Sequence, residues 1–182
     1  MDIIIDLYKY FSRFVPKPVL EDMFIQPGDT RDTGYDEVRS EILAESDENR
    51  IDAIEAFVVS INENFVSQRV KNTKGVILFV EYGKINLNHD QANGVRQALS
   101  VTVVNDFSIV DNDNLNEILL MNECWIILDS IIQTMNEEQG SLDFCGGSEL
   151  VTYPVDIRPV DPVTFYGRGG WSAIFENSKT IL

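Results

Sequence analysis

The residue types from which enzymes build reactive groups are sparse in this chain of 182 residues. His89 is the single histidine and lies in the polar stretch Asn86–Asp90, so no second imidazole is present for metal binding or a proton relay. A Ser-His-Asp or Cys-His arrangement would have to use His89, yet the sequence contains no G-x-S-x-G elbow or comparable nucleophile motif. We therefore interpret His89 as a surface-loop residue and expect no nucleophilic hydrolysis.

The two cysteines also lack the spacing of a functional site. Cys124 lies within an apolar helical pattern, and Cys145 lies beside Gly146 and Gly147. Because there is no C-x-x-C pair and no cluster of histidines, the sequence argues against both a disulfide framework and a zinc site. Carboxylate pairs for acid-base chemistry are uninformative here, since 30 acidic residues supply pairs somewhere in any fold.

The stretch Asp111–Asn116 superficially matches the start of a calcium-binding loop. The match fails at the positions that set the geometry, because Leu115 stands where an oxygen ligand is needed and Asn116 stands where glycine is required. Asn122 also replaces the bidentate glutamate. The same short oxygen-bearing side chains are typical of a helix start, where they accept hydrogen bonds from free backbone N–H groups. We predict no metal site and no cofactor.

The glycine-rich stretch Gly167–Gly170 precedes a strand pattern rather than a helix and lacks a following Lys-Ser/Thr pair, so it predicts a hairpin turn rather than a phosphate site. Tyr166 and Trp171 flank this turn, whose glycines allow another backbone to approach closely. Aromatic residues are more often core than binding anchors, and Trp171 is the preferred anchor. Tyr166, Arg168 and Trp171 are the candidate partner-contact residues, and no catalytic residue is predicted.

The chain is strongly acidic, with 14 basic against 30 acidic residues and a formal net charge of −16. This balance argues against a surface that neutralises nucleic-acid phosphates. No Lys, Arg or His occurs between Arg96 and Arg158, whereas acidic residues recur throughout that stretch. Solubility, a cation site, a basic protein partner, or a surface that repels or imitates DNA would each account for such a negative face.

Hydrophobic spacing predicts the elements that must position these residues. Helices are expected over about 2–14, before Pro16 and Pro18, over about 48–67, and over about 111–139. Strands are expected over 76–82, 99–104, 149–157 and 171–175, with Pro154 favouring a sheet edge. The polar residues 27–49 predict a loop, and 83–94 a long connection between strands. The apolar side of the 111–139 helix is wider than one stripe, which indicates a second contact beside its packing on the sheet.

These elements predict an α+β fold, with a mostly antiparallel sheet of about four strands packed by two helices and an N-terminal helical arm. We divide the chain into an arm with an acidic loop, 1–46, and a single domain, 47–182. The start Met1–Leu7 lacks the basic region and long apolar run of a signal peptide, and no apolar run approaches membrane-spanning length. We therefore expect a cytoplasmic origin and no membrane partner.

The order of elements resembles that of phage tail-terminator and head-tail joining proteins over about residues 48–177. The resemblance rests on a helix, the strand pair Gly75–Ile85 and Leu99–Asp106, the long helix Asp113–Glu138, and a closing hairpin through Tyr153 and Gly170–Phe175. It implies small α/β subunits that assemble into a ring, commonly hexameric, which caps the tail tube and meets the head connector. It also implies a location in the host cytoplasm during assembly and then in the virion tail or neck, with no enzyme activity.

Two other classes of function stay open at this point. One is an acidic inhibitor or DNA mimic that binds a basic site on a nuclease or restriction enzyme, because the surface charge would suit such a partner. The other is a small-molecule enzyme that uses dispersed carboxylates. The leading hypothesis is a non-enzymatic structural protein of a phage or prophage, which acts by self-association and contacts with tail or connector proteins.

Overall fold

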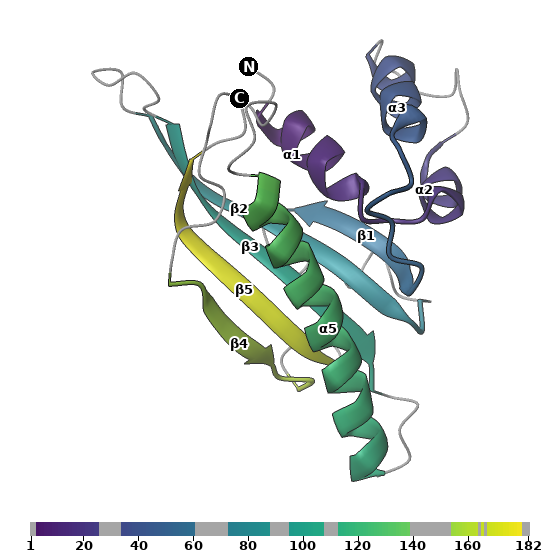
Figure 1. Cartoon of the computed structure of the whole chain (residues 1–182), viewed down its shortest axis with the longest axis vertical. Helices are drawn as coiled ribbons and strands as arrows, with labels where there is room; N and C mark the ends of the chain where they lie inside the picture. Colours follow the sequence, from purple (N-terminus) through teal and green to yellow (C-terminus); the bar gives the residue numbers. More distant parts are fainter. Residues whose placement is uncertain are drawn as a thin grey trace.

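The computed structural model describes residues 3–25, 34–60, 73–87, 95–107, 113–138, 154–163, 165 and 167–179. Within these residues the helices are α1 (Ile3–Ser12), α2 (Lys17–Met23), α3 (Tyr35–Ala44) and α5 (Asn114–Glu138). The strands are β1 (Ile54–Ser60), β2 (Val76–Leu87), β3 (Val95–Asp106), β4 (Asp156–Val160) and β5 (Arg168–Lys179). The predicted α+β class is confirmed, with four helices and five strands in the described part of the chain (Figure 1).

The strands form one mixed sheet in the order β1-β2-β3-β5-β4. Only β1 and β2 run parallel, and the other three neighbouring pairs are antiparallel. Strand β2 continues as far as Leu87 and strand β3 begins at Val95, so the predicted connection over 83–94 is too long. Strand β4 lies at one edge of the sheet, where Pro159 is tolerated. Residues 149–153 of the predicted strand 149–157 lie outside the described residues.

The predicted helix over about 48–67 is wrong, because residues 54–60 form β1. Every residue of β1 except Glu55 and Val59 is buried, so the strand shows no alternation of apolar and polar side chains. A strand buried on both faces reads as a continuous apolar run, which also satisfies a three-to-four spacing. The pairing with β2 decides between the two structures, and that pairing is not visible in local sequence.

The predicted loop over 27–49 is also corrected, because it contains α3. This helix buries only Ile42, while Val38 and Leu43 lie partly buried against the core. Tyr35, Val38 and Ile42 have helical spacing, but the polar and acidic residues around them favour a loop when the sequence is read alone. Asp36 and Glu37 lie in the first turn of α3, where negative charges stabilise a helix by interacting with its free N–H groups.

The predicted turn Gly167–Gly170 shrinks to Gly167, since Arg168–Gly170 already belong to β5. Gly167 has a φ of 81°, a left-handed conformation that glycine adopts readily. Gly170 is needed for another reason: a Cβ atom there would collide with the carbonyl oxygen of Val103 on the neighbouring strand. The glycines therefore serve the turn and the close contact between β3 and β5.

The main core lies between one face of the sheet and helices α1 and α5. It contains these buried side chains from α1 and its following turn, the sheet and α5, among others: Leu7, Phe11, Phe14, Phe57, Leu78, Val101, Leu128 and Ile131. A smaller cluster of Ala56, Val58, Ile77, Phe79, Val104 and Phe165 forms on the other face. The N-terminal helix is thus part of the main core, while the division of the chain at residues 46 and 47 stays a prediction.

Polar contacts hold α1 in this position. The Tyr10 hydroxyl donates to Glu138 Oε2 of α5 over 2.8 Å, and Arg13 forms an ion pair with the same carboxylate. Burial, reinforced by the charge of Glu138, raises the pKa of Tyr10, so its phenol stays protonated and keeps donating. At the end of α1, Arg50 Nη1 donates to the carbonyl oxygens of Ser12, at 2.9 Å, and of Val15.

Replacement of Phe11 by alanine tests the contribution of α1 to the core. Phe11 is fully buried, so Phe11→Ala should lower the free energy of unfolding by about 3–5 kcal/mol through lost packing and a residual cavity. Ile5→Ala on the exposed side of the same helix is the matched control and should change it by less than about 1 kcal/mol. Urea unfolding followed by circular dichroism measures both. Equal effects of the two substitutions would contradict the packing described.

Candidate functional site

Trp171, the preferred anchor among the predicted contact residues, joins β5 to α5. Its indole Nε1 donates to the carbonyl oxygen of Met121 over 3.0 Å. Its ring meets that of Trp125 edge-on, with centroids 5.3 Å apart and an interplanar angle of 74°. Trp171 is partly buried and packs against the main core. The structure therefore gives Trp171 an internal role and leaves Trp125 on the outer side of this aromatic pair.

Arg168 and Tyr166, the other two predicted contacts, are not brought together with Trp171 at a described surface. Arg168 is 7% exposed, and its Nη2 donates to the carbonyl oxygen of Thr73 over 2.6 Å. Burial lowers the pKa of Arg168, while the nearby Asp106 opposes that effect. Tyr166 lies outside the described residues. The role of the three residues as partner contacts stays a prediction.

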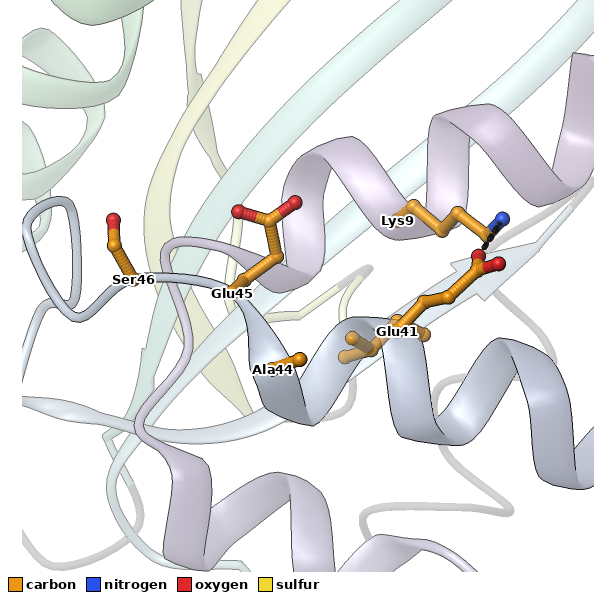
Figure 2. Close-up of a pocket in the computed structure, with 6 residues that line it drawn as sticks. Lys9, Glu41, Ala44, Glu45 and Ser46 are labelled. Carbon is orange, nitrogen blue, oxygen red and sulfur yellow. Dashed lines mark ion pairs between the residues drawn. The ribbon is translucent and has the colours of Figure 1, made fainter.

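A hollow between α1 and α3 is lined by charged side chains, among them Lys9 and Glu41 (Figure 2). Lys9 forms an ion pair with Glu41 across it, whereas the side chains of Glu45 and Ser46 stand apart from that pair. The hydrogen bond that Lys9 donates to Glu41 is the main cause that raises the pKa of Lys9, against a partial opposing effect of burial. A protonated amine is not a nucleophile, so this geometry favours a bridge between two helices over covalent chemistry.

Polar clusters elsewhere are small. Three hydroxyl groups on adjacent strands β3 and β5 bond to one another: Thr102 donates to Ser172 over 2.7 Å, and Ser100 lies 3.3 Å from Ser172. Ser100 and Ser172 border a shallow groove of about 320 Å³ that is also lined by Glu81 and Ile174. No group of three or more His, Cys, Asp or Glu side chains among the described residues could hold a metal ion.

The most unusual surface belongs to α5, which is apolar on two opposite sides. Its buried residues all lie from Cys124 onward: Cys124, Ile127, Leu128, Ile131, Ile132 and Met135. On the other side, five large apolar side chains are between 38% and 65% exposed: Leu115, Ile118, Leu119, Trp125 and Ile126. At 3.6 residues per turn these five share one face, which we call the α5 stripe.

The α5 stripe extends roughly 17 Å along the helix axis at 1.5 Å per residue. Its first turns project past the ends of the strands, so they have no sheet beneath them (Figure 1). Glu123 lies on one flank of the stripe and Asp129 lies beyond Ile126 at its end, while α5 contains no Lys or Arg. The exposed Asn122 lies on the same face, between Leu119 and Trp125. The stripe thus consists of two apolar segments on either side of one polar side chain, with an acidic border.

By length and composition, α5 is also a candidate membrane span, with 33% of its most apolar window buried inside the protein. The core helix of a globular protein meets the same criterion. The exposed side of α5 is apolar only as far as Ile126 and continues with Asp129 and Gln133, which hydrogen-bond to each other over 2.7 Å. A lipid-facing helix would need a longer apolar surface than this.

A second apolar surface lies between edge strand β1 and helices α1, α2 and α3. This cavity of about 320 Å³, which we call the β1 groove, is lined by residues that include Tyr8, Met23, Phe24, Val38, Arg39 and Val59. The Arg39 guanidinium lies over the Phe24 ring at 6.0 Å from its centroid. Its Nε atom is buried and makes no hydrogen bond within the described part of the chain.

Sequence reasoning finds part of this arrangement. The wide apolar side of the long helix indicates a second contact, and that side is the α5 stripe. The β1 groove has no signal, because the sequence favours a loop at residues 35–44 and a helix at residues 54–60. Its walls come from α1, α2, α3 and β1, which local patterns do not relate to one another.

The reactivity of Cys124 tests whether its thiol could act in catalysis. Burial raises the pKa of Cys124 to about 12, against a small opposing backbone hydrogen bond, and Glu123 adds to the shift. In a Cys145→Ser variant at about pH 8, labelling by a disulfide reagent should be at least about 1,000-fold slower than for an exposed thiol, because little thiolate forms below that pKa. Labelling should become rapid after unfolding in urea. Rapid labelling of the native protein would contradict this burial.

No protein-family model matches this chain, and no curated protein and no solved structure shows significant similarity to it.

Proposed function

We propose that this protein is a non-enzymatic structural subunit that acts by assembling with other protein subunits, of the tail-terminator or head-tail joining type found in phages and prophages. The observation that supports the proposal is the α5 stripe, in which five large apolar side chains face solvent on one side of a helix. Exposed apolar surfaces of this size mark interaction sites in proteins that otherwise keep such side chains inside.

The size of the exposed apolar area favours an interface over a chance exposure. The five side chains present an apolar surface on the order of 500 Å², which is at the upper end of what a monomer exposes as one patch. A stable interface buries about 800 Å² on each partner, so the α5 stripe with a polar rim is of suitable size. Burial of one such side chain contributes about 1.5–3 kcal/mol, and several together offset the entropy lost on association.

The phage assignment draws on the order of elements and on charge. The strand pair β2 and β3, the long helix α5 and the closing strands β4 and β5 follow one another in the order that the resemblance to tail-terminator proteins implies, although strand β1 stands where that resemblance implies a helix. A net charge of −16 would suit a ring through which DNA passes without adhering, since like charges repel. Both observations support the proposal without depending on any reactive side chain.

A second candidate function is an acidic inhibitor that binds a basic protein. The observation that favours it is the absence of Lys and Arg from the whole of α5, next to an exposed apolar surface. Its binding would weaken sharply as salt rises, whereas association through the α5 stripe would persist or strengthen.

Light scattering coupled to size-exclusion chromatography tests the proposal. We expect a discrete oligomer whose population grows with protein concentration and persists in about 1 M salt, because the contact is mainly apolar. Leu119→Asp should shift the protein toward the monomer, since it places a charge in the α5 stripe. Asn136→Asp, which adds the same charge to an exposed site on the same helix two turns beyond Asp129, is the control. A wild-type protein that stays monomeric at all concentrations would overturn the proposal.

A further inference from the structure

Two features of the molecule are left without a partner by the fold itself. One is the α5 stripe, which is apolar and bordered by Glu123 and Asp129. The other is the β1 groove, which is apolar and contains the Arg39 guanidinium. The two surfaces lie far apart on the same chain, because the first turns of α5 are at the opposite end of the molecule from α2 and α3 (Figure 1). They therefore cannot cover each other within one subunit.

The situation of Arg39 is unusual for this protein. The chain has 30 acidic and only 14 basic residues, so carboxylates are abundant. Even so, Arg39 forms no ion pair with any described residue, and its buried Nε lacks a hydrogen-bond acceptor there. An arginine that lines an apolar groove and whose buried Nε lacks an acceptor is well placed to bind a carboxylate from outside.

We propose that the α5 stripe of one subunit binds the β1 groove of a second copy of this chain. Apolar side chains of the stripe enter the groove beside Phe24 and Val59, and a carboxylate at the border of the stripe pairs with Arg39. This contact is head-to-tail, because the two surfaces differ and each subunit carries both. Repetition of such a contact closes a ring when the rotation per subunit permits. The inference rests on the proposed function and specifies its interface.

Charge favours this pairing over the alternatives. If two α5 stripes met each other, Glu123 and Asp129 of both copies would come together, and α5 has no basic residue to neutralise them. An anionic membrane surface would repel the same carboxylates. The β1 groove supplies both an apolar wall and a positive charge, so it complements the stripe in both respects.

A mixing experiment separates this interface from every symmetric one. Leu119→Asp disrupts the stripe and leaves the groove intact, whereas Met23→Asp disrupts the groove and leaves the stripe intact. Both positions are exposed, at 57% and 41%, so each variant should fold, which circular dichroism and thermal unfolding verify. Each variant alone should be monomeric under conditions where the wild type assembles. Their equimolar mixture should form a one-to-one dimer and nothing larger, because one working stripe and one working groove remain.

The outcomes distinguish the two proposals. If the wild type assembles but the mixture stays monomeric, or if Met23→Asp assembles normally, the stripe and groove are not partners, while the proposed assembly function stands. If the wild type itself is monomeric at every concentration, both proposals fail. A dimer in the mixture supports the head-to-tail interface, because a stripe-to-stripe contact would be lost in the Leu119→Asp partner.

Reversal of the charge at Arg39 tests the polar part of the contact. Arg39→Glu should weaken assembly at least tenfold, because a buried carboxylate would then face the acidic border of the neighbouring stripe. Arg158→Glu is the control for net charge, since Arg158 lies on β4 away from the groove and is highly exposed. Sedimentation velocity over a range of concentrations measures both dissociation constants. Equal weakening by the two substitutions would show that only net charge matters and would overturn the role of Arg39.

Discussion

The packing of α5 across β3 and β5 is the interaction on which the rest of this structure depends. From Cys124 onward, α5 places Cys124, Leu128, Ile131 and Met135 against the sheet, and these side chains join the main core. Because α5 is fixed there, its last turn can hold α1 through Glu138, and the carbonyl of Met121 can accept the indole N–H of Trp171. Without this contact the N-terminal helix would lose its polar attachment to α5.

The same contact creates the surface that we associate with function. A helix has one side toward the sheet, so residues opposite that side meet solvent or a partner. In α5 those residues include Leu115, Leu119 and Ile126, which are as apolar as the buried side. A helix that is apolar all round is stable when both sides are covered, and the described part of the chain covers only one. Association would remove this imbalance, which is why we connect the fold to assembly.

The chemistry of the described side chains agrees with a binding function rather than a reaction. The Cys124 thiol is buried and its pKa is raised to about 12, so little thiolate is available at neutral pH. Lys9 is paired with Glu41 and stays protonated, and the phenol of Tyr10 donates to Glu138. Each of these groups has a structural partner that accounts for its position. Among the described residues, Arg39 Nε in the β1 groove is buried without a hydrogen bond, as is one nitrogen each of Arg50 and Arg168, whose other nitrogens donate to backbone carbonyl oxygens.

The sequence by itself determined the α+β class, the first helix, the two central strands and the long helix, because their patterns are strong and local. The breadth of the apolar side of α5 also indicated a second contact for that helix. Tertiary structure alone decided that residues 54–60 form β1 rather than a helix, since their parallel pairing with β2 buries both faces of the strand. It also decided that Trp171 supports α5 instead of standing free, and that Arg39 lies in a groove built from α1, α2, α3 and β1. These features depend on contacts between residues far apart in the chain, and the local spacing of apolar residues does not indicate such contacts.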